Sequence, residues 1–226
     1  KEQATMFNKA IGCSRFVFNH FLAKWKDTYE ETGKGLTYNI CSNMLTSTKK
    51  EIDWLREIDA TSLQNSLKNL ADSFARFFKK QNQYPRFKSR KNKVQTYTSQ
   101  CNYPKKGNPT IEVVENRIRL PKVGWVQFAK SRNLKGRILF ATIRRVPTGK
   151  YYISILCEMN QSPYIPVERR KAVGVDLGLK DFAILTDGTK VRPPRFFRQY
   201  EKQLAKAQRI MSRRKKGGQN WHKARI

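Results

Sequence analysis

One aspartate stands in a stretch that otherwise has the composition of a buried β-strand. The stretch is VGVDLGLKDFAILTDG at residues 173–188, and the aspartate is Asp176. Val173 and Val175 are β-branched, and the FAIL run after them indicates a second strand that ends at an Asp-Gly turn. A carboxylate in a buried strand costs on the order of several kcal/mol unless a positive group pairs with it. Asp176 therefore either has a structural role at the strand end or binds a positively charged group.

Three kinds of site place an acid on such a strand. In the first, Asp176 belongs to an RNase H-like metal site, whose two ions, about 3.5–4 Å apart, clamp the attacking and leaving oxygens of a phosphodiester. Flanking glycines would there keep side chains clear of the substrate. In the second, VDLG opens an actin- or hexokinase-like ATPase, but Leu179 and Lys180 stand where that fold usually has Ser or Thr hydroxyls. In the third, Asp176 caps its own turn. The positive charge of the chain favours the first.

Asp176 cannot form a magnesium site by itself, because Mg²⁺ prefers several oxygen ligands. After Asp187 the sequence contains one further acid, Glu201, which falls on a predicted helix. We therefore expect Mg²⁺ at Asp176 only together with acids that are not in this chain.

The net charge indicates a polyanionic partner. The 226 residues include 47 Lys and Arg against 17 Asp and Glu, for a net charge of +30. Such an excess repels itself unless a polyanion neutralises it, which favours nucleic acid over the weaker alternative of a membrane surface. No run approaches the roughly 18 apolar residues of a membrane span, and no membrane partner is expected. The four cysteines form no CxxC pair, which predicts reduced thiols in a cytoplasmic protein.

The charge is concentrated in the later part of the chain. Residues 1–80 contain 13 basic and 9 acidic side chains. Residues 81–170 contain 19 and 4, and residues 171–226 contain 15 and 4. The chain therefore divides into a nearly neutral first part and a basic remainder.

Hydrophobic spacing predicts helices first and strands later. Apolar residues recur at helical intervals over 5–30 and 60–80, with a shorter helix over 37–50. Residues 83–93, QYPRFKSRKNK, alternate aromatic and basic side chains around a proline. That pattern suits the bases and phosphates of nucleic acid, and it also suits a solvated linker. Residues 110–158 indicate two β-hairpins with turns at EN and TGK.

A second break in composition, SPYIPVERRK at 162–171, indicates a domain boundary. A helix is predicted after the 173–188 hairpin, with cations over much of its surface. Such a helix fits a groove between nucleic-acid strands, and a solvated helix is the plainer alternative. Its apolar face comprises Phe197, Tyr200, Leu204, Ala207 and Met211.

Seven ordered segments together resemble the TnpB family, transposon-encoded RNA-guided nucleases related to compact type V CRISPR effectors. The resemblance extends over nearly the whole chain. The segments are GCSRFVFNHFLA (12–23), GKGLTY (33–38), LQNSLKNL (63–70), YPRFK (84–88), RLPKVGWV (119–126), AVGVDLGLKDFAILTDG (172–188) and SRRKKG (212–217).

The resemblance implies an α+β multidomain protein. Residues 1–82 would form a helical recognition lobe, whose first part could join the following domain. Residues 83–166 would form an antiparallel β-barrel wedge domain. Residues 167–226 would form the start of an RNase H-like (RuvC) α/β domain and the basic helix after it.

The resemblance also implies partners and roles. Asp176 would be the first RuvC carboxylate, and the partners would be a structured guide RNA and a double-stranded DNA target, met at the nucleoid of a prokaryotic cytoplasm. Amides and hydroxyls read base edges, so the candidates for reading a short target-adjacent motif are Tyr38, Ser42, Gln64, Gln100 and Asn102. Phosphate contacts position a protein without specifying sequence, and the candidates are Arg86, Lys88, Arg144, Arg145, Arg213 and Arg214.

The sequence departs from the family pattern at both ends. Family members begin with a β-strand before the segment that starts at Lys1, and they continue past Gly217 with a second RuvC acid, a four-cysteine zinc module and a third acid. We therefore expect these residues to be part of a longer chain, with Zn²⁺ only in the part outside this sequence.

Three functions remain open on the sequence alone. They are an RNA-guided, Mg²⁺-dependent DNA endonuclease, a nuclease-deficient RNA-guided DNA-binding repressor, and a DNA-binding transposition accessory protein that uses no RNA. The first is favoured, because a chain released from cutting has no chemical reason to keep a carboxylate at position 176.

Overall fold

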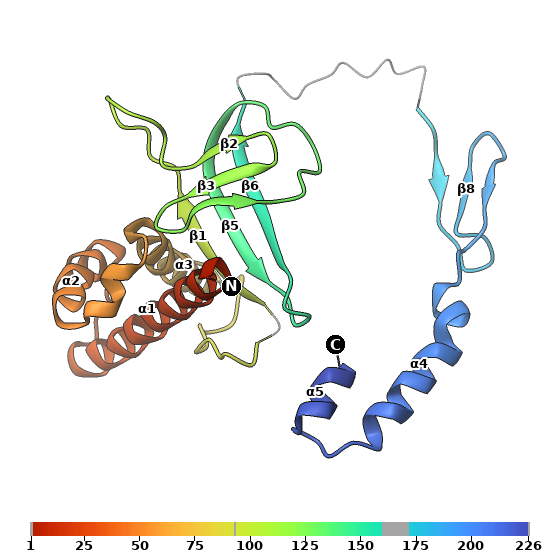
Figure 1. Cartoon of the computed structure of the whole chain (residues 1–226), viewed down its shortest axis with the longest axis horizontal. Helices are drawn as coiled ribbons and strands as arrows, with labels where there is room; N and C mark the ends of the chain where they lie inside the picture. Colours follow the sequence, from red (N-terminus) through yellow and green to blue (C-terminus); the bar gives the residue numbers. More distant parts are fainter. Residues whose placement is uncertain (1, 93, 160–171, 226) are drawn as a thin grey trace. The chain divides into compact units, whose positions relative to one another are not determined.

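The protein divides into two compact units. The computed structural model describes residues 2–92, 94–159 and 172–225. The first unit spans Lys1–Asn160 and the second spans Gln161–Ile226 (Figure 1). The domain boundary expected between residues 166 and 167 falls outside the described residues, and the one expected between 82 and 83 lies within the first unit. Both stay predictions.

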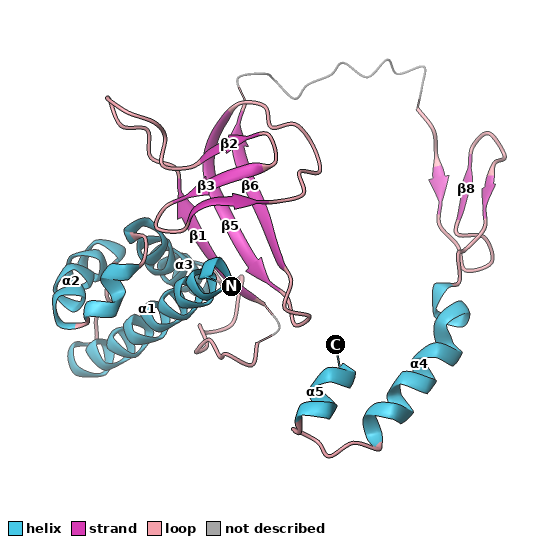
Figure 2. Ribbon diagram, viewed as in Figure 1, coloured by secondary structure: helices cyan, strands magenta, loops and turns pink. Residues whose placement is uncertain are grey.

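The first unit begins with three α-helices and a short 3₁₀ helix, which confirms the helices predicted from apolar spacing. Buried apolar residues of α1 and α3 belong to one core. Helix α1 packs against α3, and α2 packs against α3 and η1. Figure 2 shows these helices as one group. The elements are α1 (Glu2–Thr32), α2 (Tyr38–Glu51), η1 (Asp53–Glu57) and α3 (Ala60–Phe78).

The core of the first unit is centred on one face of α1. Val17 and Phe21 are fully buried there, and each such side chain contributes about 1.5–3 kcal/mol through the hydrophobic effect. Trp25 stacks on Phe74 of α3, with ring centroids 4.2 Å apart. Gly35 crosses close to this indole, since a Cβ at Gly35 would lie 2.6 Å from the Trp25 Nε1 atom. Packing against Trp25 therefore favours a glycine at position 35, the second glycine of the GKGLTY segment.

Two three-stranded antiparallel sheets follow the helices. Their hairpin turns lie at EN (115–116) and TGK (148–150), as predicted. The first sheet has the order β1-β5-β6, formed by Gln95–Gln100, Arg137–Arg145 and Tyr151–Glu158. The second has the order β2-β3-β4, formed by Glu112–Val114, Arg117–Leu120 and Gly124–Gln127.

The expected closed β-barrel is not seen among the described residues. There the two sheets are separate, and no hydrogen-bonded ladder joins them. A barrel requires each strand to pair on both sides around a closed ring. The strands of the second sheet are only 3 or 4 residues long, which leaves little backbone for pairing on a second edge. The mixed α+β class is confirmed.

The first sheet is fastened to the helices at two places. Phe7 of α1 packs against Tyr151 of β6, with ring centroids 5.2 Å apart. At the start of α3, the Asp59 carboxylate accepts hydrogen bonds from the Thr61 backbone N–H (3.3 Å) and from the buried Ser99 hydroxyl of β1. The Thr61 hydroxyl in turn accepts a hydrogen bond of 3.0 Å from the Gln100 backbone N–H. Asp59 thus caps a helix and anchors a strand.

The second unit contains a small antiparallel sheet followed by two helices. The sheet has the order β7-β8-β9, formed by Val175–Asp176, Ala183–Leu185 and Lys190–Val191. The helices are α4 (Phe196–Ser212) and α5 (Gln219–Arg225), neither of which buries a residue. The predicted hairpin and the predicted basic helix are both confirmed.

One expectation about the second unit is wrong. The strand around Asp176 was expected to be buried, but the apolar residues before and after Asp176 in the sequence are exposed. Val173 is 56% exposed, Val175 is 57% exposed and Leu177 is 69% exposed. The reason is that β7 has only two residues and pairs only with β8, so among the described residues no layer covers either face.

Asp59→Ala should lower the free energy of unfolding by about 1–3 kcal/mol, because it removes a helix cap and leaves a buried hydroxyl without its acceptor. Urea unfolding followed by circular dichroism measures this. Asp72→Ala, at an exposed position on the same helix, should change the free energy by no more than about 0.5 kcal/mol. Equal losses in the two variants would contradict the anchoring role of Asp59.

Candidate nucleic-acid interface

Asp176 lies opposite Ile184 in the β7–β8 ladder, at an exposed position. Among the described residues, no hydrogen bond or ion pair engages its carboxylate. Asp187 is different, because its Oδ1 atom accepts a 2.8 Å hydrogen bond from the Thr189 backbone N–H. That bond holds the pKa of Asp187 below its usual value. The turn-capping role considered for Asp176 therefore belongs to Asp187.

Gly174, two residues before Asp176, lies close to the Thr186 side chain, which would have to move to admit a Cβ atom. A Cβ atom there would lie 2.6 Å from the Cγ2 atom of Thr186. The Gly174 backbone N–H also donates a 3.2 Å hydrogen bond to the Thr186 hydroxyl. The glycines beside Asp176 were expected to keep side chains clear of a substrate. For Gly174 the structure also shows a local reason, which is the close Thr186 side chain.

The acids near Asp176 do not complete a metal site. Over residues 2–92, 94–159 and 172–225, no three His, Cys, Asp or Glu side chains cluster in a way that could hold a metal ion. The described part of the chain therefore does not by itself fit Mg²⁺, and the expectation that further acids lie outside this sequence stays a prediction.

Four of the candidates for motif reading lie on three elements of the first unit, and Asn102 lies in the loop after one of them. Tyr38 begins α2 and packs partly against the core, and Ser42 follows one turn later. Gln64 is exposed on α3. Gln100 ends β1, and Asn102 follows it, donating a 2.8 Å backbone hydrogen bond to the Thr110 hydroxyl.

The Asp59–Thr61–Ser99 hydrogen bonds link the elements that carry two of these candidates. They join the first turn of α3 to the end of β1, so Gln64 and Gln100 lie on directly bonded elements. Tyr38 and Ser42 lie on α2, which packs against α3. Whether these side chains read DNA stays a prediction.

The six candidate phosphate contacts differ in what they touch. Arg144 and Arg213 are exposed, and neither side chain has a partner among the described residues. Arg86 bonds Gln83 (2.7 Å), and Arg145 bonds Asn8 (3.0 Å). Arg214 donates to the Asn220 carbonyl (3.1 Å), and the Lys88 ammonium lies 3.9 Å from the centroid of the Phe18 ring. Arg144 and Arg213 are thus the freest to meet phosphates.

Helix α4 combines an exposed apolar face with many cations. Its one acid, Glu201, pairs with Arg198 at 3.3 Å, so the remaining cations of this helix have no acidic partner within it. On the apolar face, Phe197 is 66% exposed. Phosphates of a nucleic acid could neutralise these cations.

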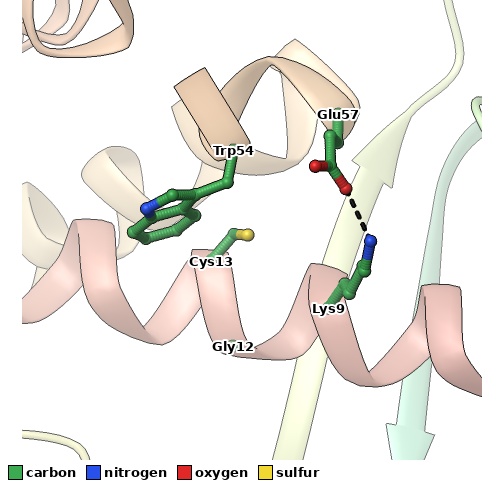
Figure 3. Close-up of a pocket in the computed structure, with 5 residues that line it drawn as sticks. All are labelled: Lys9, Gly12, Cys13, Trp54 and Glu57. Atoms are coloured by element: carbon green, nitrogen blue, oxygen red, sulfur yellow. Dashed lines mark hydrogen bonds and ion pairs between the residues drawn. The ribbon is translucent and has the colours of Figure 1, made fainter. Parts of the chain in front are cut away.

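A small pocket lies between α1 and η1 (Figure 3). Lys9 and Glu57 close one side of it with a 2.7 Å ion pair, and Trp54 and Cys13 lie on the other. Burial raises the pKa of the Cys13 thiol to about 11, so the thiol is protonated and unreactive near neutral pH. The residues that line this pocket hold α1 and η1 together, and its cysteine is not an activated nucleophile.

No helix in the described ranges is long and apolar enough to cross a membrane.

Comparison with protein families gives two matches. A family model described as "Probable transposase" matches residues 154–226, which include Asp176 and α4. A model described as "Helix-turn-helix domain" matches residues 1–34. In the structure the second match covers one continuous helix, α1, and α2 begins beyond it at Tyr38. The helix-turn-helix description therefore does not correspond to two helices within the matched residues.

Two curated relatives match along nearly the whole chain. The chain is 34% identical over 225 residues to "Putative RNA-guided DNA endonuclease InsQ" of Escherichia coli (strain K12), covering 98% of this chain and 54% of that protein. It is 31% identical over 228 residues to "Putative RNA-guided DNA endonuclease" of Streptomyces pristinaespiralis, covering 99% of this chain and 55% of that protein. The chain thus spans about half the length of these relatives. Together with the ordered segments, these matches place it: the chain belongs to the TnpB family.

Proposed function

We propose that the chain is part of an RNA-guided DNA endonuclease of a transposable element. The observation that supports this most is the Asp176 carboxylate. It stands on a strand between glycines and has no protein partner in the described part of the chain, within the segment that matches the transposase model. A carboxylate without a local structural role is available to bind a metal ion.

In this proposal Asp176 is the first carboxylate of a RuvC-type site. It would supply one oxygen ligand, and acids outside this sequence would supply the others. When bound, Mg²⁺ would supply Lewis-acid stabilisation of the charge that develops on the phosphodiester.

The partners in this proposal are a structured guide RNA and a double-stranded DNA target. The net charge of +30 and the unpaired cations of α4 support a polyanionic partner. Base pairing with the guide would specify most of the target, while the protein would read only a short adjacent motif. Gln64, Gln100 and Asn102 would contribute to that reading together with Tyr38 and Ser42. A DNA target places the protein at the nucleoid of a prokaryotic cytoplasm.

Asp176→Asn in the native protein, purified with its RNA, should reduce DNA cleavage in Mg²⁺ at least about a hundredfold. Losing a metal ligand removes several kcal/mol of transition-state stabilisation, and each 1.36 kcal/mol is about tenfold in rate. Guided binding to the same DNA should be nearly unchanged. Cleavage is measured on labelled duplex, and binding is measured by gel shift.

Asp187→Asn is the matched control, because it removes a carboxylate from the same hairpin while keeping an acceptor for the Thr189 N–H. It should leave cleavage within about twofold of wild type. Full cleavage by Asp176→Asn would rule out the metal role. Guided binding without cleavage by the wild-type protein would instead support an RNA-guided DNA-binding repressor.

RNA affinity of the chain should fall steeply with salt. A protein with six to ten phosphate contacts loses about 10³–10⁵-fold in affinity between about 50 and 200 mM salt, because bound counterions are released. Replacing Arg144 and Arg213 by Gln should flatten the logarithmic slope by about 0.7 for each cation on single-stranded RNA. Fluorescence anisotropy at several salt concentrations measures the slope.

Lys34→Gln together with Lys50→Gln removes the same charge from the nearly neutral first part of the chain and should leave the slope nearly unchanged. A flat salt profile for the wild-type chain would argue against the basic residues as the RNA-binding surface.

A further inference from the structure

Residues 84–88, YPRFK, have no regular secondary structure, yet the segment is held against the helices of the first unit at both ends. At its start, Tyr84 packs edge-on against two rings of α3. Its centroid lies 5.6 Å from that of Phe74 and 5.4 Å from that of Phe77. Pro85, which follows, is buried. The first end of the segment is therefore anchored by apolar packing.

Asn19 of α1 anchors the other end of this segment. Its Oδ1 atom accepts a 2.8 Å hydrogen bond from the Lys88 backbone N–H, and its Nδ2 atom donates a 2.9 Å hydrogen bond to the Lys88 carbonyl. The Lys88 ammonium lies 3.9 Å from the centroid of the Phe18 ring. One side-chain amide thus satisfies both backbone polar groups of a residue outside regular secondary structure. The backbone is therefore fixed immediately before and after Arg86 and Phe87.

Phe87 is the ring that this anchoring leaves in solvent. It is 59% exposed, although phenylalanine is among the residues most often buried. Among the described residues its ring has no aromatic or cationic partner, in contrast to Tyr84. A single exposed apolar side chain is common on protein surfaces and has no meaning by itself. Phe87 differs because the backbone on both sides of it is fixed, so little conformational freedom is lost when the ring packs on a ligand.

The sequence around Phe87 favours a negatively charged ligand with aromatic faces. Between Asp72 and Glu112 there are ten Lys and Arg and no acid. Arg86, next to the ring, donates a 2.7 Å hydrogen bond to Gln83, a neutral partner that leaves its charge uncompensated. A nucleic-acid strand presents both phosphates and flat bases, and protein aromatic rings stack on bases of any sequence.

We propose that Phe87 stacks on one unpaired nucleobase and that Asn19 is the positioning residue for this ring. The base is unpaired, because a base inside a duplex is already stacked and paired and would have to be extruded at a cost. Stacking recognises a base, whereas the cations around the ring recognise phosphates. The proposal rests on the proposed function only in taking a nucleic-acid strand as the partner.

Phe87→Leu should lower the affinity of the native protein, freed of bound RNA, for a single RNA strand by about five- to 150-fold, the value of one stacked base. The strand is fluorescein-labelled, of mixed sequence and without self-complementarity, and anisotropy measures its binding. The logarithmic salt slope should not change, because no phosphate contact is lost. Affinity for the same strand annealed to its complement should stay within about twofold, and so should calorimetric affinity for polyphosphate, which has no bases.

Two further variants control for the ring and for its exposure. Phe87→Tyr keeps an aromatic ring and should bind the single strand as the wild type does. Phe78→Leu removes a ring that is 68% exposed at the end of α3, outside the anchored segment, and should change the affinity by no more than about twofold. The RNA-free Phe87→Leu protein should unfold at the wild-type temperature. A lower unfolding temperature would mean that the ring packs within the protein, and it would overturn the proposal.

Asn19→Ala tests the positioning role. Without its two hydrogen bonds the ring must be ordered on binding, so affinity for the single strand should fall about two- to tenfold. In the Phe87→Leu background the same substitution should have no further effect, because the ring that Asn19 positions is gone. An equal loss in both backgrounds would show a general structural role and would overturn the positioning role.

The outcomes separate this proposal from the proposed function. A single DNA strand of the same sequence is titrated in parallel, and the strand whose affinity falls more in Phe87→Leu supplies the base. If the wild type binds single strands and Phe87→Leu binds them equally well, stacking is overturned while nucleic-acid binding stands. A loss that is equally large on the duplex overturns it too. If the wild type binds no nucleic acid, the proposed function fails and stacking fails with it.

Discussion

The packing of α1 against both α3 and the β1-β5-β6 sheet is the contact on which the first unit depends. Val17 and Phe21 are fully excluded from water in this contact, and Phe7 extends it onto the sheet. Because one helix touches both layers, its polar residues are carried to the boundary between them. Arg15 reaches β1 in this way, where it donates a 2.9 Å hydrogen bond to Gln95, and Asp59 ties the neighbouring helix to the strand that ends at Gln100.

Most of the positive charge lies beyond residue 80, in the strand-rich part of the first unit and in the second unit. In the described part of the second unit the cations and many apolar side chains are exposed. Like charges at such density repel one another. Among the residues that the structure describes, the Asp176 carboxylate has no hydrogen-bond or ion-pair partner. Both features have a physical reason if the partners are phosphates and a metal ion. The same partners would explain why a protein with a well-packed first unit leaves α4 without a buried residue.

Local features of the fold could be predicted from the sequence, and non-local ones could not. Helices α1 and α3 follow from apolar residues at helical spacing, and the hairpins follow from turn residues between β-branched runs. The absence of a closed barrel among the described residues depends on how distant strands pair, which spacing does not reveal. Exposure of Val175 depends on what covers a sheet. The contact between Asp59 and Ser99 has no spacing signal, because the two residues come from separate elements.

RNA-dependent DNA cleavage is the property that distinguishes this account from its alternatives. The native protein, purified with its RNA, would be incubated with duplex DNA in Mg²⁺ before and after treatment with ribonuclease. The account predicts that cleavage is lost after treatment and returns when the intact RNA is added back. Cleavage that survives the removal of RNA would contradict guidance, and no cleavage with the RNA intact would contradict the nuclease.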